Sequence, residues 1–188
     1  EVVEQATVFV IRHHRQGEKP VVIGDVALES EEQVLLIDKY VAKDAENMIY
    51  GIGGDGKSYF AQACCVAMDQ GVPLANLTGQ GFDGRLKGRI LYLDWETSPQ
   101  DFGRRVQFIQ HGLGLPDAKS TILYRRCVRD FISDLPLIHG MIVDHDIKLV
   151  VHDSGGGAVR GKLMEDAAVV DYFLGMRSLN VTNWVIHH

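Results

Sequence analysis

Short apolar runs alternate with longer amphipathic stretches along most of the chain, and this pattern predicts an α/β fold. The apolar runs predict strands at residues 48–50, 89–93, 121–124, 147–152 and 184–186. The amphipathic stretches predict helices at residues 59–68, 98–111, 132–143 and 165–179. In the last of these, Val169, Val170, Phe173 and Met176 are expected to share one face, and Pro136 is expected near the first turn of its helix. Such alternation favours a mostly parallel sheet with helices on both faces.

The first part of the chain has a different pattern. Short strands are predicted at residues 6–11 and 21–23, and the spacing of apolar residues favours a helix at residues 29–40. We therefore expect two parts: an N-terminal extension at residues 1–43, with short strands and a helix, and a core domain at residues 44–188.

The segment GIGGDGKS, residues 51–58, lies between the first core strand and the first core helix. It matches the phosphate-binding pattern G-x-x-x-x-G-K-[ST] at every required position. Glycines let consecutive N–H groups curl around an anion, and the positive end of the next helix faces the same point. A chance GKS in a glycine-rich turn is disfavoured by the flanking strand and helix. The predicted nucleotide-binding residues here are Gly51, Gly53, Gly54, Asp55, Gly56, Lys57, Ser58 and Tyr59.

Three carboxylates follow predicted strands, where ligands bind in parallel sheets. Asp153 ends an apolar strand and is assigned, with the Ser58 hydroxyl, to Mg²⁺. The Ser-Gly-Gly-Gly run after it is expected to be a mobile loop that senses the γ-phosphate. Glu96 is assigned as the general base, with Lys57 completing the catalytic pair. The alternative is that Glu96 merely begins the next helix, while Asp94 is a structural or supporting residue.

Two adjacent histidines, His187 and His188, follow the last predicted strand. Their side chains should point to opposite faces, so at most one of them faces the nucleotide. We expect that one to sense the γ-phosphate, although an ordinary structural histidine remains the alternative. Neither CxxC nor HExxH spacing is present, so zinc is not expected.

Composition narrows the class further. A chain of 188 residues fits one α/β domain, and its net charge of −6 does not suggest a surface that wraps duplex DNA. No apolar run approaches the ~20 residues of a membrane span, and the start lacks signal-peptide features. Three cysteines do not make a disulfide framework, so Cys64, Cys65 and Cys127 are expected to be packing residues. Together these features predict a cytoplasmic protein without membrane association.

The motifs YGIGGDGKS, LYLDWET with Arg104 and Arg105, LVVHDSGGG and VTNWVIHH occur in this order from about residue 44 to the end. In this order they resemble the RepA-type hexameric plasmid helicases, which belong to the RecA-like ATPases often grouped as AAA-family ATPases. The resemblance implies a RecA-like P-loop NTPase fold. It implies phosphate and Mg²⁺ binding by Lys57 and Ser58, and γ-phosphate sensing by the terminal histidines. It also implies Glu96 as the base and Asp153 as the metal-organising residue.

The chain departs from this family at two points. His152 stands before Asp153 where the family has an aliphatic residue, so it could perturb strand packing. Family members also continue beyond the position of His188 through strands that carry DNA-contacting loops and a trans-acting arginine. An ATPase core incomplete at its C-terminus is therefore expected.

These features lead to an expected function. The chain should bind ATP and Mg²⁺ and hydrolyse ATP as a DNA helicase or related DNA replication or recombination ATPase. Single-stranded DNA is the expected partner, and a homo-oligomeric ring, hexameric by resemblance, is the expected assembly. The alternatives are a nucleotide-gated regulatory or scaffold ATPase and, less favoured, a P-loop kinase, for which no arginine-rich lid is evident. A GTPase is disfavoured because no N-K-x-D motif occurs.

Overall fold

The computed structural model describes residues 35–37, 40–72, 74, 89–159 and 166–187, together with Val22. Val34–His188 forms one compact unit. The strand predicted at residues 6–11 lies outside the described residues, as does the strand at residues 21–23 apart from Val22. His188 is also outside them.

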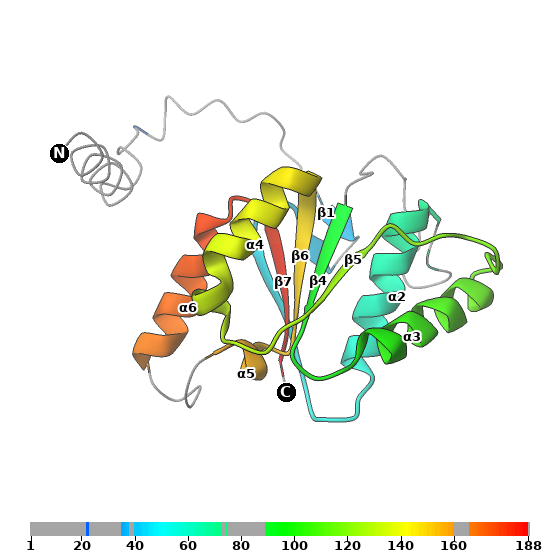
Figure 1. The fold of residues 1–188 in the computed structure, drawn as a ribbon, viewed down its shortest axis with the longest axis horizontal. Coiled ribbons are helices and arrows are strands. Elements are labelled where there is room, and N and C mark those ends of the chain that lie inside the picture. The colour runs from blue at the N-terminus through cyan, green and yellow to red at the C-terminus, as the bar shows by residue number, and fades with distance from the viewer. Residues whose placement is uncertain are drawn as a thin grey trace. The chain divides into compact units, whose positions relative to one another are not determined.

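The core is a five-stranded, all-parallel sheet, which confirms the predicted α/β fold of the RecA-like P-loop type (Figure 1). Its strands, in spatial order, are β3 (Glu46–Tyr50), β7 (Thr182–His187), β6 (Ile147–Asp153), β4 (Arg89–Asp94) and β5 (Leu123–Arg126). Because all five run in the same direction, their carboxyl ends meet at one edge, and ligands bind at this edge in such sheets.

Helices cover both faces of the sheet (Figure 1). On one face lie α2 (Lys57–Gln70) and α3 (Pro99–Gly112), and on the other lie α4 (Phe131–His145) and α6 (Asp166–Ser178). The strand side chains divide between the two faces: Tyr92 packs with the first helix pair, whereas Leu91 and Leu93 pack with the second. Burial on both faces explains why β4 and β6 are nearly continuous apolar runs.

Local capping explains where two of these helices begin. The Ser98 side chain accepts a hydrogen bond from Asp101 N at 3.1 Å, and Pro99 occupies the first turn of α3. The Asp130 side chain accepts one from Ser133 N at 2.9 Å at the start of α4. Both caps satisfy backbone N–H groups that have no partner inside the helix.

The helix predicted at residues 29–40 is wrong in its described part. Residues Leu35–Ile37 form a strand, β1, which pairs antiparallel with β2 (Val41–Ala42). A short apolar run is ambiguous between helix and strand, and here the nearby β2 provides a pairing partner. Leu36 and Val41 are buried in the same core as α2 and α3.

Three smaller expectations also need correction. Strand β5 begins at Leu123 and ends at Arg126, so it lies two residues later than predicted. Pro136 is inside α4, in its second turn rather than its first. Val170 is exposed, whereas Tyr172 and Met176, four residues apart, carry the buried face of α6.

The three cysteines are free and buried, as predicted for packing residues. Burial raises the pKa of Cys64 to about 12 and that of Cys127 to about 11. These thiols therefore stay protonated at neutral pH, and the thiolate needed for nucleophilic or metal-binding chemistry is not formed.

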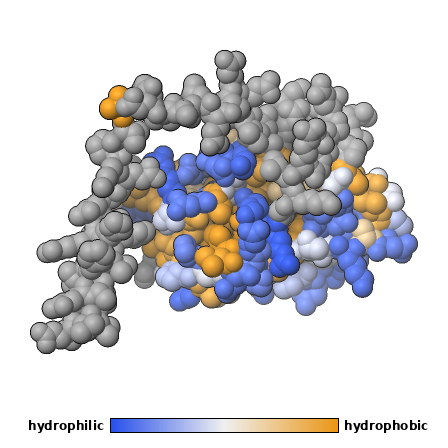
Figure 2. All heavy atoms as spheres, turned by 90° about the horizontal axis from the view of Figure 1, so that it is seen from above, coloured by the Kyte–Doolittle hydropathy of each residue, from blue (hydrophilic) through white to orange (hydrophobic). Residues whose placement is uncertain are grey.

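Within the described residues, no helix is both long enough and apolar enough to cross a bilayer. The described surface seen in Figure 2 mixes hydrophilic side chains with smaller hydrophobic areas. This view looks onto the end of the sheet opposite the carboxyl ends of the strands.

Candidate functional site

The loop of residues 51–56 joins β3 to α2 and surrounds a lysine head group. Gly54 and Gly56 have φ angles of 90° and 77°, a conformation that favours glycine. The helix begins directly afterwards at Lys57, which is only 6% exposed. Its Nζ donates hydrogen bonds of 2.8 Å to the Gly51 carbonyl and 2.6 Å to that of Ile52. The loop thus holds a buried positive charge at the N-terminus of a fourteen-residue helix, where anions are favoured.

The residue after this lysine contacts the end of β6. Ser58 Oγ donates a 3.0 Å hydrogen bond to Asp153 Oδ1, and the Tyr92 hydroxyl donates a 2.7 Å bond to Asp153 Oδ2. Burial raises the pKa of Asp153, these two hydrogen bonds lower it, and the charges of Asp94 and Glu96 raise it again. A hydroxyl and a carboxylate in contact are oxygen ligands of the type that Mg²⁺ prefers, and a cation here would offset the buried negative charge.

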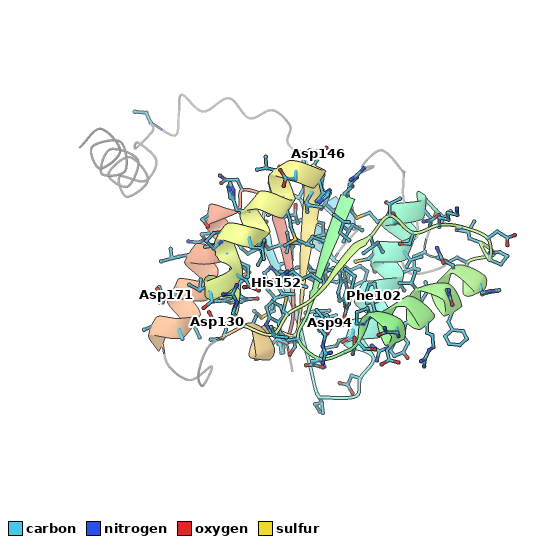
Figure 3. All side chains as sticks on the ribbon, viewed as in Figure 1. Asp94, Phe102, Asp130, Asp146, His152 and Asp171 are labelled. Carbon is cyan, nitrogen blue, oxygen red and sulfur yellow. The ribbon has the colours of Figure 1, made fainter. Side chains whose placement is uncertain are left out.

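Asp94, at the end of the neighbouring strand β4, organises the turn that follows (Figure 3). It is fully buried, and its Oδ1 accepts hydrogen bonds from Glu96 N at 2.7 Å and Thr97 N at 2.8 Å. Its Oδ2 accepts hydrogen bonds from Thr97 Oγ1 and, at 3.2 Å, from the Tyr124 hydroxyl. All of these bonds are internal to the protein, so Asp94 fixes the backbone at Glu96, consistent with the expected supporting role.

Glu96 is exposed at the same edge of the sheet. It lies two residues before Ser98, the capping residue of α3, and the acidic residue in the first turn of that helix is Asp101. The alternative that Glu96 begins the helix is therefore wrong. Burial is the main cause of the raised pKa of Asp153, and the negative charge of Glu96 adds to it.

The segment after Asp153 is not a loop, contrary to expectation. Residues Gly155–Ala158 form a short helix, α5, whose N-cap is Ser154. His187 ends β7 beside Tyr50 of β3, the residue just before the glycine loop. A Cβ built on Gly155 would lie 3.7 Å from His187 Nδ1, so this histidine is next to α5. The structure thus places His187 at the same edge as the other site residues.

Comparison with protein families is consistent with this geometry. The family model described as an AAA domain matches residues 12–188. The chain belongs to the AAA domain family. It is therefore a P-loop ATPase by family, and its fold and its glycine loop agree with that assignment. A search of curated proteins found no match.

His152 does not disturb the packing of this AAA domain. It is buried, and Figure 3 shows it between the sheet and α4. Its ring lies against Phe131 and Tyr172, with ring centroids 4.9 and 5.6 Å away. Its Nε2 is 3.1 Å from Asn183 Oδ1. Burial lowers the pKa of His152 to about 4 despite this hydrogen bond, so the ring is neutral at pH 7. Asn183 supplies a polar partner for Nε2, whereas the buried Nδ1 has no hydrogen-bond partner among the described residues.

Several arginines of the AAA domain have specific partners, whereas sequence analysis gave them no role in the site. Arg125 Nη2 is 2.9 Å from the carboxylate of fully buried Asp134, and Arg129 pairs with the other oxygen of that carboxylate. The Arg105 guanidinium lies 4.8 Å from the ring centroid of Tyr59, the residue after Ser58. Tyr59 is 54% exposed, so this pair forms an accessible flat surface beside the glycine loop.

Two tyrosines of the site were not predicted from sequence. Tyr92 and Tyr124 bind Asp153 and Asp94, the two carboxylates that end β6 and β4. The sequence does contain one indication of Tyr92. Side chains alternate between the two faces of a strand, so Tyr92 lies on the same face as Asp94, two residues later. A buried tyrosine hydroxyl needs a hydrogen-bond partner, and the carboxylates provide it.

Proposed function

We propose that this AAA domain binds ATP with Mg²⁺ and hydrolyses it as a RecA-like motor, either a DNA helicase or a related DNA replication or recombination ATPase. The observation that carries the proposal is the 3.0 Å contact between Ser58 Oγ and Asp153 Oδ1 beside the buried Lys57 ammonium. It joins the phosphate-binding loop to a carboxylate on another strand, which is the arrangement that a nucleotide-bound Mg²⁺ requires.

ATP would be held by the backbone of the glycine loop and by Lys57 and Tyr59. The loop contributes Gly51, Gly53, Gly54, Asp55 and Gly56. Ser58 and Asp153 would hold Mg²⁺, which when bound offsets negative charge on the phosphates. The Tyr59–Arg105 surface suits the flat adenine ring of ATP, because aromatic rings and guanidinium planes stack on such rings.

Glu96 and Lys57 are the proposed catalytic residues. The Glu96 carboxylate would orient the attacking water and accept its proton, and Lys57 would stabilise charge that develops on the transferred phosphoryl group. Glu96 lies in a turn that is anchored by the buried Asp94. This position supports its role as the general base, because a base must be held in place. His187, which ends β7, or the adjacent His188 would respond to the terminal phosphate.

The partners and domain limits are proposals that rest on resemblance. Single-stranded DNA and assembly into a homo-oligomeric ring, hexameric by resemblance, fit the RepA-type motifs, while the proposed cytoplasmic location rests on the cysteine usage. We place the ATPase core at residues 44–188 and the extension at residues 1–43. The end of this extension supplies Leu36 and Val41 to the core packed against α2.

The nucleotide assignment is tested first by binding. Lys57→Ala should abolish ATP binding measured by calorimetry, because it removes the buried charge inside the loop. Lys148→Ala is the control, since Lys148 pairs with exposed Asp146 at the opposite end of β6. Retention of micromolar ATP affinity by Lys57→Ala would remove the P-loop assignment.

Hydrolysis and motor activity need two further measurements. Glu96→Gln should bind ATP like the wild type and release no phosphate, and unchanged turnover would place the base elsewhere. Stimulation of hydrolysis by single-stranded DNA supports a motor. Turnover that is slow and insensitive to DNA supports the regulatory or scaffold ATPase instead, and transfer of phosphate to a small molecule supports the kinase.

A further inference from the structure

Trp95, immediately before Glu96, ties together three segments at the carboxyl edge of the sheet. Its backbone N donates a 2.7 Å hydrogen bond to Asp153 O, which extends the pairing of β4 with β6 to the site. Its indole Nε1 donates a 2.8 Å bond to Arg129 O, in the connection between β5 and α4. Glu96 is therefore attached to a residue held by both its backbone and its side chain.

The third contact of Trp95 is with α5. A Cβ built on Gly157 would lie 2.5 Å from Trp95 Cβ and 3.0 Å from its Cγ, far closer than two carbon atoms can approach. Helix α5 therefore packs directly on Trp95 and does so only with glycine at position 157. The colliding atom is Trp95 Cβ, which a side-chain rotation cannot move away.

The same short helix reaches β7 on its other side. A Cβ built on Gly155 would lie 2.8 Å from Val185 Cγ1 and 3.7 Å from His187 Nδ1. The four residues of α5 thus fill the space between Trp95 and the end of β7, and they begin just after Ser154. A shift of α5 in either direction must displace one of these neighbours.

We propose that Trp95 is a positioning residue for Glu96, and that its close contact with Gly157 fixes the position of the base relative to Asp153. This inference rests on the proposed ATPase function. The hydrogen bond to Arg129 O holds the indole, the indole and α5 hold the backbone at position 95, and that backbone carries Glu96. Since an error of about 1 Å in a catalytic group can cost ~100-fold in rate, such support affects turnover more than binding.

The test compares turnover with nucleotide affinity in the purified protein. Trp95→Phe removes the indole N–H but keeps an aromatic ring, and should lower kcat about 3- to 10-fold. Gly157→Ala forces Trp95 to move and should lower kcat at least about tenfold. In both variants the Kd for ATP should stay within about twofold of wild type, because Lys57 and the glycine loop are untouched.

Gly175→Ala is the matched control for Gly157→Ala. Its new Cβ would lie 2.7 Å from Ile132 Cδ1 and 3.0 Å from Phe131 Cε1, between α6 and α4. It should lower the Tm but leave kcat unchanged. If Gly157→Ala does not fold, the Trp95→Phe measurement decides alone.

Three results would overturn the inference. They are unchanged kcat in Trp95→Phe and Gly157→Ala, parallel loss of kcat and ATP affinity, or an equal loss of kcat in Gly175→Ala. Glu96→Gln, assayed alongside, separates this failure from failure of the proposed function. If Glu96→Gln turns over like wild type, Glu96 is not the base and the role of Trp95 falls with it, whereas the proposed ATPase function fails only if the wild-type protein does not hydrolyse ATP.

Discussion

The Tyr92 hydroxyl donates a 2.7 Å hydrogen bond to Asp153 Oδ2, while Ser58 binds the other oxygen of the same carboxylate. Tyr92 comes from β4 and Ser58 from α2, so two elements fix one side chain of β6. Burial and the charge of Asp153 together raise the pKa of Tyr92, which therefore keeps its proton and remains a donor. Asp153 is thus held in one orientation before any cation binds.

Tyr92→Phe should weaken Mg²⁺ binding while the fold is retained. Hydrogen bonds that orient a metal-binding side chain are commonly worth 10- to 100-fold in metal affinity, and we expect about tenfold here. The measurement is the Mg²⁺ concentration that gives half-maximal ATP hydrolysis. Tyr172→Phe is the control, because the Tyr172 hydroxyl is buried and has no hydrogen-bond partner among the residues that the structure describes. An unchanged Mg²⁺ requirement in Tyr92→Phe would show that Ser58 alone suffices to orient Asp153.

Asp94→Ala should impair both stability and turnover. The substitution leaves Glu96 N, Thr97 N and two hydroxyls without their acceptor, and each buried group that loses its partner costs about 1–3 kcal/mol. The turn that carries Glu96 should loosen, so kcat should fall more than ATP affinity. Urea unfolding and steady-state kinetics measure the two effects.

The graded control for Asp94→Ala is Tyr124→Phe. It removes one 3.2 Å bond to Asp94 and one 3.1 Å bond to the Thr97 carbonyl, and leaves both backbone contacts of Asp94 in place. Its effect on kcat should be clearly smaller. Equal losses in the two variants would mean that the tyrosine, rather than the aspartate, holds the turn.

The sheet and its helices could be predicted because their signals are local. Asp94 and Asp153 end apolar runs that are buried on both faces, and Ser98 and Asp130 cap helices within two residues of their predicted starts. The spatial order of the strands, by contrast, depends on pairing between distant segments. Nothing near Thr182 indicates that β7 lies between β3 and β6.

The site residues that were missed depend on contacts across the fold. Tyr92 meets Asp153 sixty-one positions away, and Trp95 meets Arg129 thirty-four positions away. Leu35–Ile37 forms a strand because β2 provides a pairing partner. The periodicity of apolar residues alone does not show that such a partner is present. The Ser-Gly-Gly-Gly run looked like a loop since glycine disfavours helices. Here the tight approach of α5 to Trp95 and Val185 excludes larger residues at positions 157 and 155.

Acid should destabilise the fold through His152. Its pKa falls from 6.5 to about 4 on burial, so the unfolded chain binds a proton that the folded chain resists. Above pH 6.5 His152 therefore does not lower the free energy of unfolding. As the pH falls from 6.5 towards 4, the free energy of unfolding decreases through His152 by about 3 kcal/mol in all. Asp153, whose pKa is raised by burial, contributes in the opposite direction over its own titration range.

The difference between wild type and His152→Val isolates this effect, because Asp153 and the seven other histidines, of eight in all, are common to both proteins. Urea unfolding at pH 7.5, 6, 5 and 4.5 should show a shallower loss of stability in the variant. Parallel pH profiles would show that His152 becomes protonated in the folded state as readily as in the unfolded chain.

Asp134→Ala should destabilise the protein without altering nucleotide binding. The carboxylate is fully buried and pairs with Arg125 and Arg129, whose side chains are 29% and 59% exposed. Removing one member of a fully buried pair costs roughly 3–5 kcal/mol, but both arginines retain water contact here, so about 1–3 kcal/mol is expected.

Arg104→Ala, which removes an exposed pair with Asp101, should cost below about 0.5 kcal/mol. The urea midpoint reports both losses if the m-value is unchanged. Because Arg129 also supplies the carbonyl that binds Trp95, a fall in kcat at constant ATP affinity would show that the Asp134 cluster supports the Trp95 contact as well as the fold.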